Sequence, residues 1–582
     1  MNKITLKKLF PIIFFLVIFI LAIAVWYSPI IFKGYSAVAT ASNGLVRARN
    51  FALTNHYSTE NNLNVILNPA LIKTQGQESN YGNKLGTIFY GFVLKIIPAT
   101  TNNQIILLNC FILSLSLIIF CLAFYYLFNL KTAFIAGLTA IFLPTNWLLP
   151  QTLVGYEIAL LFLSLFILFF SLGAKKFIKD KKIINKLKFW PEGFCLILSG
   201  IFLILSCLSR EAFFLVLPIL FIFLLFIKFK KQLLYVFVPI ILIWCFTWLP
   251  DFINGKNTYL LFFTTQTQEK LKASDYAYYA HLFPDPYSYI FANQEILNAK
   301  QNFENTDVME RLGREKVLAN MGQGSIDLWQ RFKLGTILTA RHIFRFFSIT
   351  EIGGPIIFCF ILLGLFYLKK QKNYWFSFLL SLFGGGIFLL AYANLAGRNH
   401  LMDWGALLAL LVALGIIYLI DIFTEKFNLS NKKSFFLTAF LTVIVIYNLV
   451  LASHVLMGQN YDKSTAPALN YYVSKINQET LNTESIIAVP FGADEVYNLN
   501  FNTNQSIVAF KEKTIQDLLA KNNLKEAFQY FKITHIIGYN QELSDQILKA
   551  DKDIKIISNN NIPIEKIDNN KNNKNWLLNL IK

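Results

Sequence analysis

Long apolar runs constrain this chain more than any other feature of its sequence. They are about 18 to 25 residues long and are separated by short lysine-rich segments, and about 20 apolar residues suffice for a helix to cross a bilayer. Of the 582 residues, 55% are hydrophobic and only 15% are charged. We therefore expect a polytopic α-helical membrane protein with about eleven transmembrane helices, at residues 10–31, 104–128, 132–149, 151–173, 192–209, 211–228, 232–250, 355–368, 374–394, 404–422 and 434–454.

The lysine-rich segments predict the topology. Lys3, Lys7 and Lys8 precede the first run, which indicates a cytoplasmic N-terminus by the positive-inside bias. The first run has no small-residue cleavage site beside it, so we expect a retained anchor. With these spans the segments "KKFIKDKKIINKLK", "KFKK", "KKQK" and "NKKS" all fall on the cytoplasmic side. The large polar segments 33–103, 251–354 and 455–582 then lie outside, as expected for a multi-pass plasma-membrane protein.

Two compositional features exclude other classes of protein. All six cysteines lie inside apolar runs, so the aqueous segments have no thiols for disulfides or cysteine-type metal sites. The formal net charge of +19 resides largely in the lysine-rich segments, where topology explains it. We expect membrane lipids as partners and no nucleic acid.

The composition becomes polar after residue 454. The β-branched runs "SIIAVP", "SIVAF", "THIIGY" and "IKIIS" alternate with the helical stretches "APALNYYVSKINQ" and "TIQDLLAKNNLKEAFQYF", which is typical of a small α/β domain. We therefore divide the chain into a transmembrane domain, residues 1–454, and an extracytoplasmic α/β domain, residues 455–582. The α/β domain has no glycine-rich phosphate loop, so we expect an accessory or acceptor-facing module.

The first outer segment opens with a basic stripe, "SNGLVRARNFALTNHY" (residues 42–57). At helical spacing Asn43 and Arg47 share one face and apolar residues occupy another, which predicts an amphipathic helix on the outer surface. Its arginines have two interpretations: contact with lipid headgroups, or a binding site. The nearby segment 86–98 is too short to span, so it is interfacial or re-entrant.

Charged residues also occur at the outer ends of several spans. Arg210 and Glu211 lie between two apolar runs with almost no loop, which is costly unless they face a polar cavity or find partners. An ordinary tight turn that enters the headgroup region is the alternative. Glu157 lies about one turn into a span, and another outer turn contains Arg398, His400 and Asp403. We expect these groups to line one outer-leaflet cavity suited to a lipid tail joined to a phosphate.

Three motifs carry a resemblance to a known class of enzymes. "GLVRARNFALTNHY", "LSREAFFLVLP" and "AGRNHLMDWGALLALLVALGIIYL", in this order and topology, resemble the GT-C class of integral-membrane glycosyltransferases. The bacterial branch that is similar to the protein mannosyltransferases and the lipid A aminoarabinose transferases resembles the chain most. The C-terminal segment beginning "ESIIAVPFGADEVYNLNF" is similar to the outer α/β tail of many such enzymes. The resemblance implies transfer of a sugar from a polyprenyl-phosphate donor to an envelope glycan, lipid or protein.

The resemblance also implies roles for individual residues. Departure of a lipid phosphate needs cations, and the acceptor needs a base; the cations would be Arg210, Arg47, Lys84 and Arg398. The family has an acid at the start of the first-loop helix, where this chain has Asn43. Glu78 is the favoured replacement, Glu60 and Glu157 are the other candidates, and lost catalysis is a further alternative. A divalent cation is compatible with the class, but no ligand cluster predicts one.

Two other classes of protein remain as alternatives. A secondary transporter usually has related halves and broken helices at the bilayer midplane, and we find no internal repeat; "LFGGGIF" is the one hint of a broken helix. A non-catalytic envelope-assembly protein would bind lipid-phosphate glycans without turnover.

Overall fold

The three-dimensional arrangement comes from a computed structural model. It describes residues 3–33, 43–55, 65–66, 84–99, 101–143, 146–147, 149–151, 156–179, 192–210, 213, 216–226, 230–253, 353–371, 404–458, 465–479, 481, 485–491, 493–503, 505–510 and 512–558. The chain divides into two compact units. The first contains Met1–Ser28, Asn80–Tyr90 and Ile106–Ser453, and the second contains Pro29–Ser79, Gly91–Ile105 and His454–Lys582.

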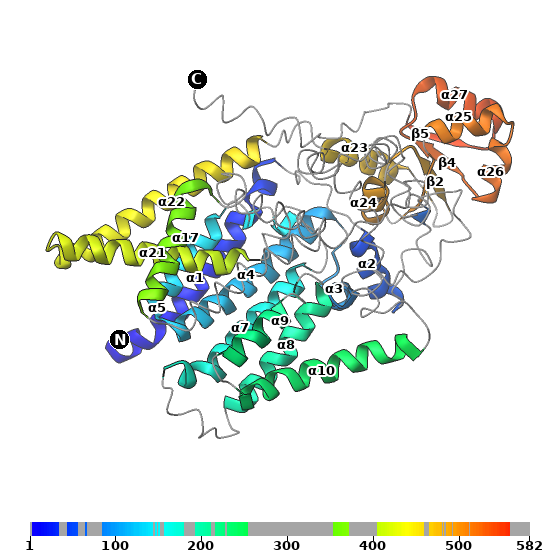
Figure 1. Ribbon diagram of the computed structural model, residues 1–582. Coiled ribbons are helices and arrows are strands. Elements are labelled where there is room, and N and C mark those ends of the chain that lie inside the picture. The colour runs from blue at the N-terminus through cyan, green and yellow to red at the C-terminus, as the bar shows by residue number, and fades with distance from the viewer. Residues whose placement is uncertain are drawn as a thin grey trace, which may run out of the picture. The chain divides into compact units, whose positions relative to one another are not determined.

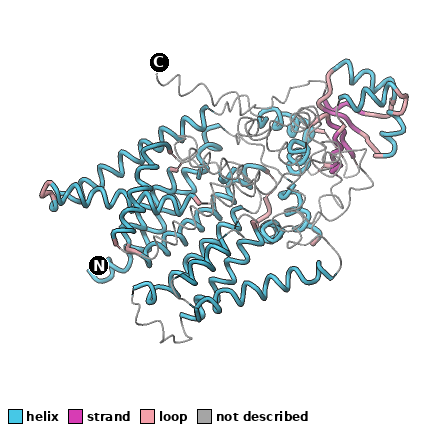
Figure 2. Tube along the Cα trace, viewed as in Figure 1, coloured by secondary structure: helices cyan, strands magenta, loops and turns pink. Residues whose placement is uncertain are grey.

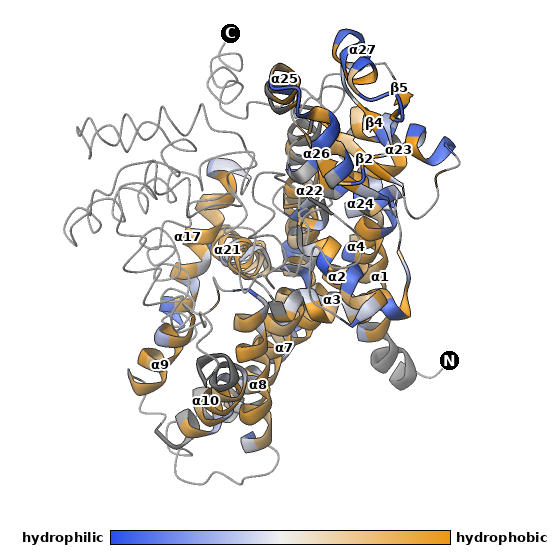
Figure 3. Cartoon of the chain, turned by 90° about the vertical axis from the view of Figure 1, so that its right-hand side faces the viewer, coloured by the Kyte–Doolittle hydropathy of each residue, from blue (hydrophilic) through white to orange (hydrophobic). Residues whose placement is uncertain are grey.

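Apolar helices make up the first unit (Figure 1). Five helices among the described residues are long and apolar enough to cross a membrane, and the five shorter apolar helices include Leu85–Ile96 of the first outer segment. Figure 3 shows hydrophobic residues along α7, α8 and α10, whereas α27 is mixed. The helices are α1 (Lys3–Lys33), α4 (Asn102–Leu127), α5 (Leu130–Phe142), α7 (Tyr156–Lys179), α8 (Phe194–Ser209), α9 (Val216–Phe226), α10 (Lys230–Ile253), α17 (Gly354–Lys370), α21 (Gly405–Lys426) and α22 (Lys433–Gly458), with the 3-10 turns η2 (Leu149–Gln151) and η8 (Ser430–Lys432).

These helices overlap ten of the expected spans, some of them only in part, and the expected span 374–394 lies outside the described residues. The expected span 132–149 is wrong in its second half, because α5 ends at Phe142. Pro144 follows and cannot donate a helical hydrogen bond, which leaves carbonyls of the last turn free. The Ala140 carbonyl accepts from Asn146 Nδ2 at 2.6 Å, and the Ile141 carbonyl accepts from the Trp26 and Trp147 indoles at 3.0 and 2.9 Å.

Glycines allow α17 and α21 to approach closely. A Cβ atom on Gly364 would lie 2.0 Å from the Leu411 carbonyl oxygen, and one on Gly415 would lie 2.0 Å from the Phe360 carbonyl oxygen. Both contacts are with backbone, which side-chain movement cannot relieve. Small residues at helix interfaces are a general means of helix association in membranes.

We expect Gly364→Val to destabilise the protein by about 2 kcal/mol or more, because the added methyl groups force α17 and α21 apart. The measurement is thermal unfolding in detergent. Leu362→Val, at an exposed position of the same helix, is the control and should leave the melting temperature nearly unchanged. Equal melting temperatures for the two variants would mean that the helices do not pack through Gly364.

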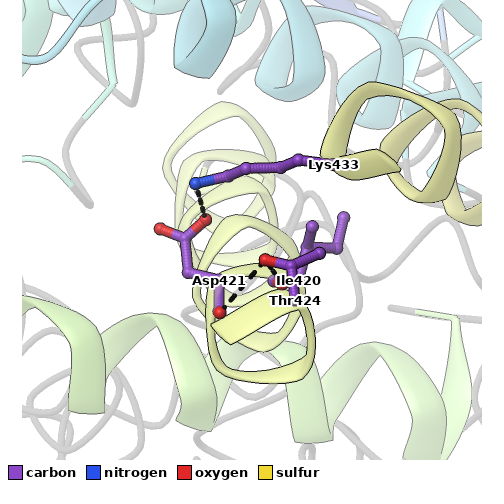
Figure 4. Close-up of polar contacts among 4 residues, drawn as sticks. All are labelled: Ile420, Asp421, Thr424 and Lys433. Atoms are coloured by element: carbon purple, nitrogen blue, oxygen red, sulfur yellow. Dashed lines mark hydrogen bonds and ion pairs between the residues drawn. The ribbon is translucent and has the colours of Figure 1, made fainter. Parts of the chain in front are cut away.

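An ion pair joins the ends of α21 and α22. Lys433 Nζ lies 2.5 Å from Asp421 Oδ1, and Thr424 Oγ1 donates to the Ile420 carbonyl at 2.8 Å (Figure 4). Lys131, at the start of α5, interacts electrostatically with both charged groups. The predicted topology places these helix ends on one side of the membrane, and they do lie together.

A five-stranded parallel sheet forms the centre of the second unit (Figure 2). The expected strands are β2 (Ile486–Val489), β3 (Ser506–Ala509), β4 (His535–Ile537) and β5 (Lys555–Ser558), and each is confirmed. The sheet order is β1-β3-β2-β4-β5, in which β1 (Val65–Ile66) comes from the first outer segment. The strands lie among α23 (Thr465–Gln478), α24 (Ala493–Thr503), α25 (Glu512–Ala520), α26 (Leu524–Tyr530) and α27 (Gln541–Ala550).

Two helices of the first outer segment complete the described chain. They are α2 (Asn43–Thr54) and α3 (Lys84–Ile96). In the second unit they meet at Gly91, where a Cβ atom would lie 2.8 Å from both the Ala48 carbonyl oxygen and the Phe51 ring. The segment predicted to be interfacial or re-entrant is thus a helix of 13 residues.

Candidate functional site

The structure describes only some of the candidate site residues. The side chains of Glu157, Arg210 and Arg47 are described, whereas Asn43 and Lys84 are placed by backbone as the first residues of α2 and α3. The remaining candidates lie outside the described residues: Glu60, Glu78, Glu211, Arg398, His400 and Asp403.

Arg210 ends α8. Its backbone is extended, with φ −149° and ψ 111°, and its N–H donates to the Ser206 carbonyl at 2.9 Å. The side chain is only 3% exposed, and its guanidinium carbon lies 3.5 Å from the centre of the Tyr156 ring. A buried cation stacked on an aromatic ring is held in a defined orientation. The helix of the predicted span 211–228 is α9, which begins at Val216; of the residues before it in that span, the structure describes only Phe213.

Glu157 is the second residue of α7 and is fully buried. Neither carboxylate oxygen has a hydrogen-bond partner in the part of the chain that the structure describes. The side chain interacts electrostatically with Arg210 and with Tyr90. An acidic group without hydrogen bonds in an apolar bundle is costly, and such groups are typical of functional sites.

Polar side chains on neighbouring helices support this pair. Tyr90 on α3 donates to Asn109 Oδ1 on α4 at 2.5 Å, and Asn109 Nδ2 donates to the Pro150 carbonyl at 3.0 Å. Ser206 on α8 donates to the Ala159 carbonyl on α7 at 2.9 Å. The hydrogen bonds therefore connect α3 to α4, α4 to η2 and α8 to α7 around the charged pair.

Sequence reasoning did not identify Tyr156, Tyr90 or Asn109. Tyr156 directly precedes Glu157 at the start of α7, and this position could have indicated that it belongs to the site. Tyr90 and Asn109 lie within apolar helices, and their partnership depends on the packing of α3 against α4. We refer to Arg210, Tyr156, Glu157, Tyr90 and Asn109 as the Arg210 cluster.

The Arg210 cluster combines a fixed cation, an acidic group and three further polar side chains. A guanidinium binds phosphate oxygens with charge-assisted hydrogen bonds, and a carboxyl in an apolar setting is suited to proton transfer near neutral pH. Among the described residues, no three His, Cys, Asp or Glu side chains are grouped to hold a metal ion. The chemistry of the cluster as described is anion binding beside an acid.

In the second unit, α2 departs from the expectation of a surface helix. Arg47 and Arg49 are 7% and 8% exposed, and the residues between Leu45 and Asn50 are buried. Arg49 donates to the carbonyls of Asn500 and Phe501, on α24. The headgroup interpretation is therefore wrong for Arg49, because α2 packs against α24 and α3.

Aromatic side chains lie at the edge of the α/β sheet where parallel sheets usually bind ligands. That place is the carboxyl end of adjacent strands at a topological switch point, here after β2 and β4. A Cβ atom on Gly538 would lie 2.5 Å from the Phe491 ring, and the Tyr539 hydroxyl donates to the Phe510 carbonyl at 2.6 Å. Aromatic side chains fill this edge.

The chain resembles known proteins in structure and not in sequence. No protein-family model matches the chain, and no curated protein matches its sequence. The apo oligosaccharyltransferase of Archaeoglobus fulgidus matches with a TM-score of 0.54 and 12% identity, over 91% of this chain and 69% of that one. The same enzyme tethered to an acceptor peptide with the NVT sequon matches with a TM-score of 0.50 and 13% identity, over the same shares.

In fold, the chain matches GT-C membrane glycosyltransferases. The resemblance to the GT-C class that the sequence motifs carry is thereby confirmed. ArnT of Cupriavidus metallidurans in the apo state also matches, with a TM-score of 0.47 and 11% identity, over 93% of this chain and 89% of that one. Arg210, Tyr156 and Glu157 of the Arg210 cluster lie at the C-terminus of α8 and the N-terminus of α7.

Proposed function

We propose that this protein transfers a sugar from a polyprenyl-phosphate-linked donor to a cell-envelope acceptor at the outer face of the plasma membrane. One observation supports this most: a buried arginine, stacked on Tyr156 and beside buried Glu157, lies among the apolar helices of a GT-C fold. A fixed cation next to hydrocarbon suits a ligand whose phosphate is joined to a lipid tail. The predicted topology places this end of α7 and α8 outside, with the N-terminus cytoplasmic.

The residues divide between two tasks in this proposal. Arg210 holds the donor phosphate and stabilises the negative charge that develops on it as the sugar leaves. Arg47, Lys84 and Arg398 are proposed as further cations around the phosphate. Glu157 is proposed to take the proton of the acceptor, because it is buried beside the cation that holds the leaving group.

The remaining acidic candidates stay as alternatives for the base. Glu78 and Glu60 lie in the first outer segment, outside the described residues, and the sequence favours Glu78. Glu211, His400 and Asp403 complete the candidates for the cavity. Since a divalent cation is compatible with the class, the assay below includes samples with Mg²⁺ or Mn²⁺ and samples with a chelator.

One observation favours a second candidate function. The first turn of α2 contains no acidic residue, and Asn43 stands where the resemblance to the GT-C class implies an acid. A non-catalytic envelope-assembly protein that binds lipid-phosphate glycans would need the cations but no base. The α/β domain would then bind a partner.

Release of label from a lipid donor tests the proposal. Purified protein in detergent is incubated with radiolabelled polyprenyl-phosphate sugars of different head groups, with and without a crude envelope fraction as acceptor. We expect wild-type protein to transfer label from one donor class when acceptor is present. Tight binding of the lipid phosphates without release from any donor would instead support the non-catalytic candidate.

A further inference from the structure

Arg49 connects the first outer segment to the α/β domain within the second unit. Its Nη1 donates to the Asn500 carbonyl at 3.1 Å and to the Phe501 carbonyl at 2.9 Å, and its Nη2 donates to Asn500 Oδ1 at 2.6 Å. Its guanidinium also lies 5.0 Å from the centre of the Phe501 ring. The side chain is 8% exposed, so these contacts take place in a desolvated setting.

The acceptors of Arg49 lie at the end of a helix. Asn500 and Phe501 belong to the last turn of α24, where carbonyl groups lack helical partners and the helix dipole is negative. A cation placed there satisfies free acceptors and interacts favourably with the dipole. Burial lowers the pKa of Arg49 to about 10, so the guanidinium remains charged at neutral pH.

Two more parts of the first outer segment meet the same place. The N–H of Asn102, the first residue of α4, donates to Asn502 Oδ1 at 3.1 Å. Asn502 Nδ2 donates in turn to the Asn498 carbonyl at 2.8 Å, which fixes the orientation of the amide. Strand β1 pairs in parallel with β3, with Val65 opposite Ile507 and Ile66 opposite Val508.

These contacts converge on residues 500–503 and 505–508, which we call the α24–β3 corner. One comes from α2, one from the start of α4 and one from the segment between α2 and α3. Segments separated by some fifty residues thus meet a single corner of the α/β domain. A tail that merely followed the membrane domain would not need to contact the first outer segment at three points.

We propose that the α24–β3 corner is the docking point of the first outer segment, and that Arg49 is the positioning residue that holds α2 for sugar transfer. The inference rests on the proposed function in one respect, which is that α2 contributes Arg47 to the donor site. Binding of an acceptor or partner to the α/β domain would change transfer through α2.

Hydrogen exchange of the full-length protein in detergent tests the docking without any assay of activity. We expect Arg49→Ala to speed exchange of the amides of residues 43–54 by about tenfold or more, because local opening no longer breaks the contacts with α24. Arg49→Lys keeps the charge and should restore part of the protection. Exchange in α7 and α21 should stay as in wild type.

Asn500→Ala provides a second variant that leaves Arg49 and the two backbone carbonyls in place. It also removes the hydrogen bond from Asn500 Nδ2 to the Gln505 carbonyl. Its effect on α2 exchange is therefore compared between the wild-type protein and the Arg49→Ala protein. We expect it to speed α2 exchange in wild type and to have a much smaller effect on α2 in the Arg49→Ala protein. Lys525→Ala, which removes an exposed charge from α26, is the matched control and should change nothing.

Transfer kinetics complete the test. Per folded molecule, Arg49→Ala should raise the donor KM and lower kcat by about tenfold, with partial rescue by Arg49→Lys. Unchanged α2 exchange in Arg49→Ala and Asn500→Ala would overturn the docking. Faster α2 exchange with normal kinetics would overturn the positioning role. If wild type releases no sugar, the proposed function fails, and the exchange data still decide the docking.

Discussion

Arg210→Ala is expected to weaken binding of a polyprenyl phosphate by about 100- to 1000-fold and to abolish measurable transfer. The guanidinium is buried and already oriented on the Tyr156 ring, so its bonds to phosphate are made with little loss of side-chain entropy. Removing one partner of a buried charged pair costs about 3–5 kcal/mol, since the other charge is left uncompensated. The measurement is the dissociation constant of a short-chain polyprenyl phosphate in detergent.

The controls separate loss of a ligand contact from loss of structure. Arg210→Lys keeps the positive charge but loses the planar group that stacks on Tyr156, so we expect an intermediate affinity, about tenfold weaker than wild type. Lys370→Ala removes an exposed cation from the C-terminus of α17 and should bind normally. Unchanged affinity in a folded Arg210→Ala protein would exclude Arg210 from the phosphate site.

Glu157→Gln is expected to lower transfer at saturating donor by about 100-fold or more, while donor affinity changes less than threefold. Glutamine has nearly the same shape, so Arg210 stays stacked on Tyr156 and the phosphate site persists. General base catalysis contributes about 10²- to 10⁴-fold to rates, and the amide cannot accept the proton. The measurement is kcat and KM for donor turnover, with lipid-phosphate affinity determined separately.

Glu78→Gln and Glu60→Gln are the matched comparisons, because each makes the same change in another candidate acid. We expect both to keep transfer within about threefold of wild type. A large loss of kcat in Glu78→Gln, with normal turnover in Glu157→Gln, would assign the base to the first outer segment, as the sequence favours. A loss of donor affinity in Glu157→Gln would make Glu157 a support for Arg210 instead.

Local patterns predicted most of the regular structure. Hydropathy over about 20 residues locates a helix because membrane burial depends on the side chains of that segment alone. The strands β2, β3, β4 and β5 were likewise recognisable from β-branched runs between turns. The early end of α5 was less evident, although Pro144 and the indoles of Trp26 and Trp147 supply its physical cause.

The sequence indicated which charged residues belong to the candidate site, but not which side chains they contact. A charge between two apolar runs indicated Arg210, and an acid one turn into a span indicated Glu157. Their association with Tyr156, Tyr90 and Asn109 depends on how α3, α4, α7 and α8 pack, which hydropathy does not encode. The basic stripe left two interpretations for its arginines, contact with lipid headgroups or a binding site, because neighbours in sequence do not show that Arg49 packs against α24.

The sequence by itself therefore determined a polytopic helical protein, an α/β tail and charged groups at the ends of spans, because each follows from short-range composition. Only the tertiary structure decided that most of the first outer segment, Pro29–Ser79 and Gly91–Ile105, belongs to the same unit as the α/β domain. Arg49 and the Asn500 carbonyl lie 451 positions apart, and β1 has only two residues. Neither has a local signal, since a buried cation and a short edge strand are stabilised by partners that folding alone brings near.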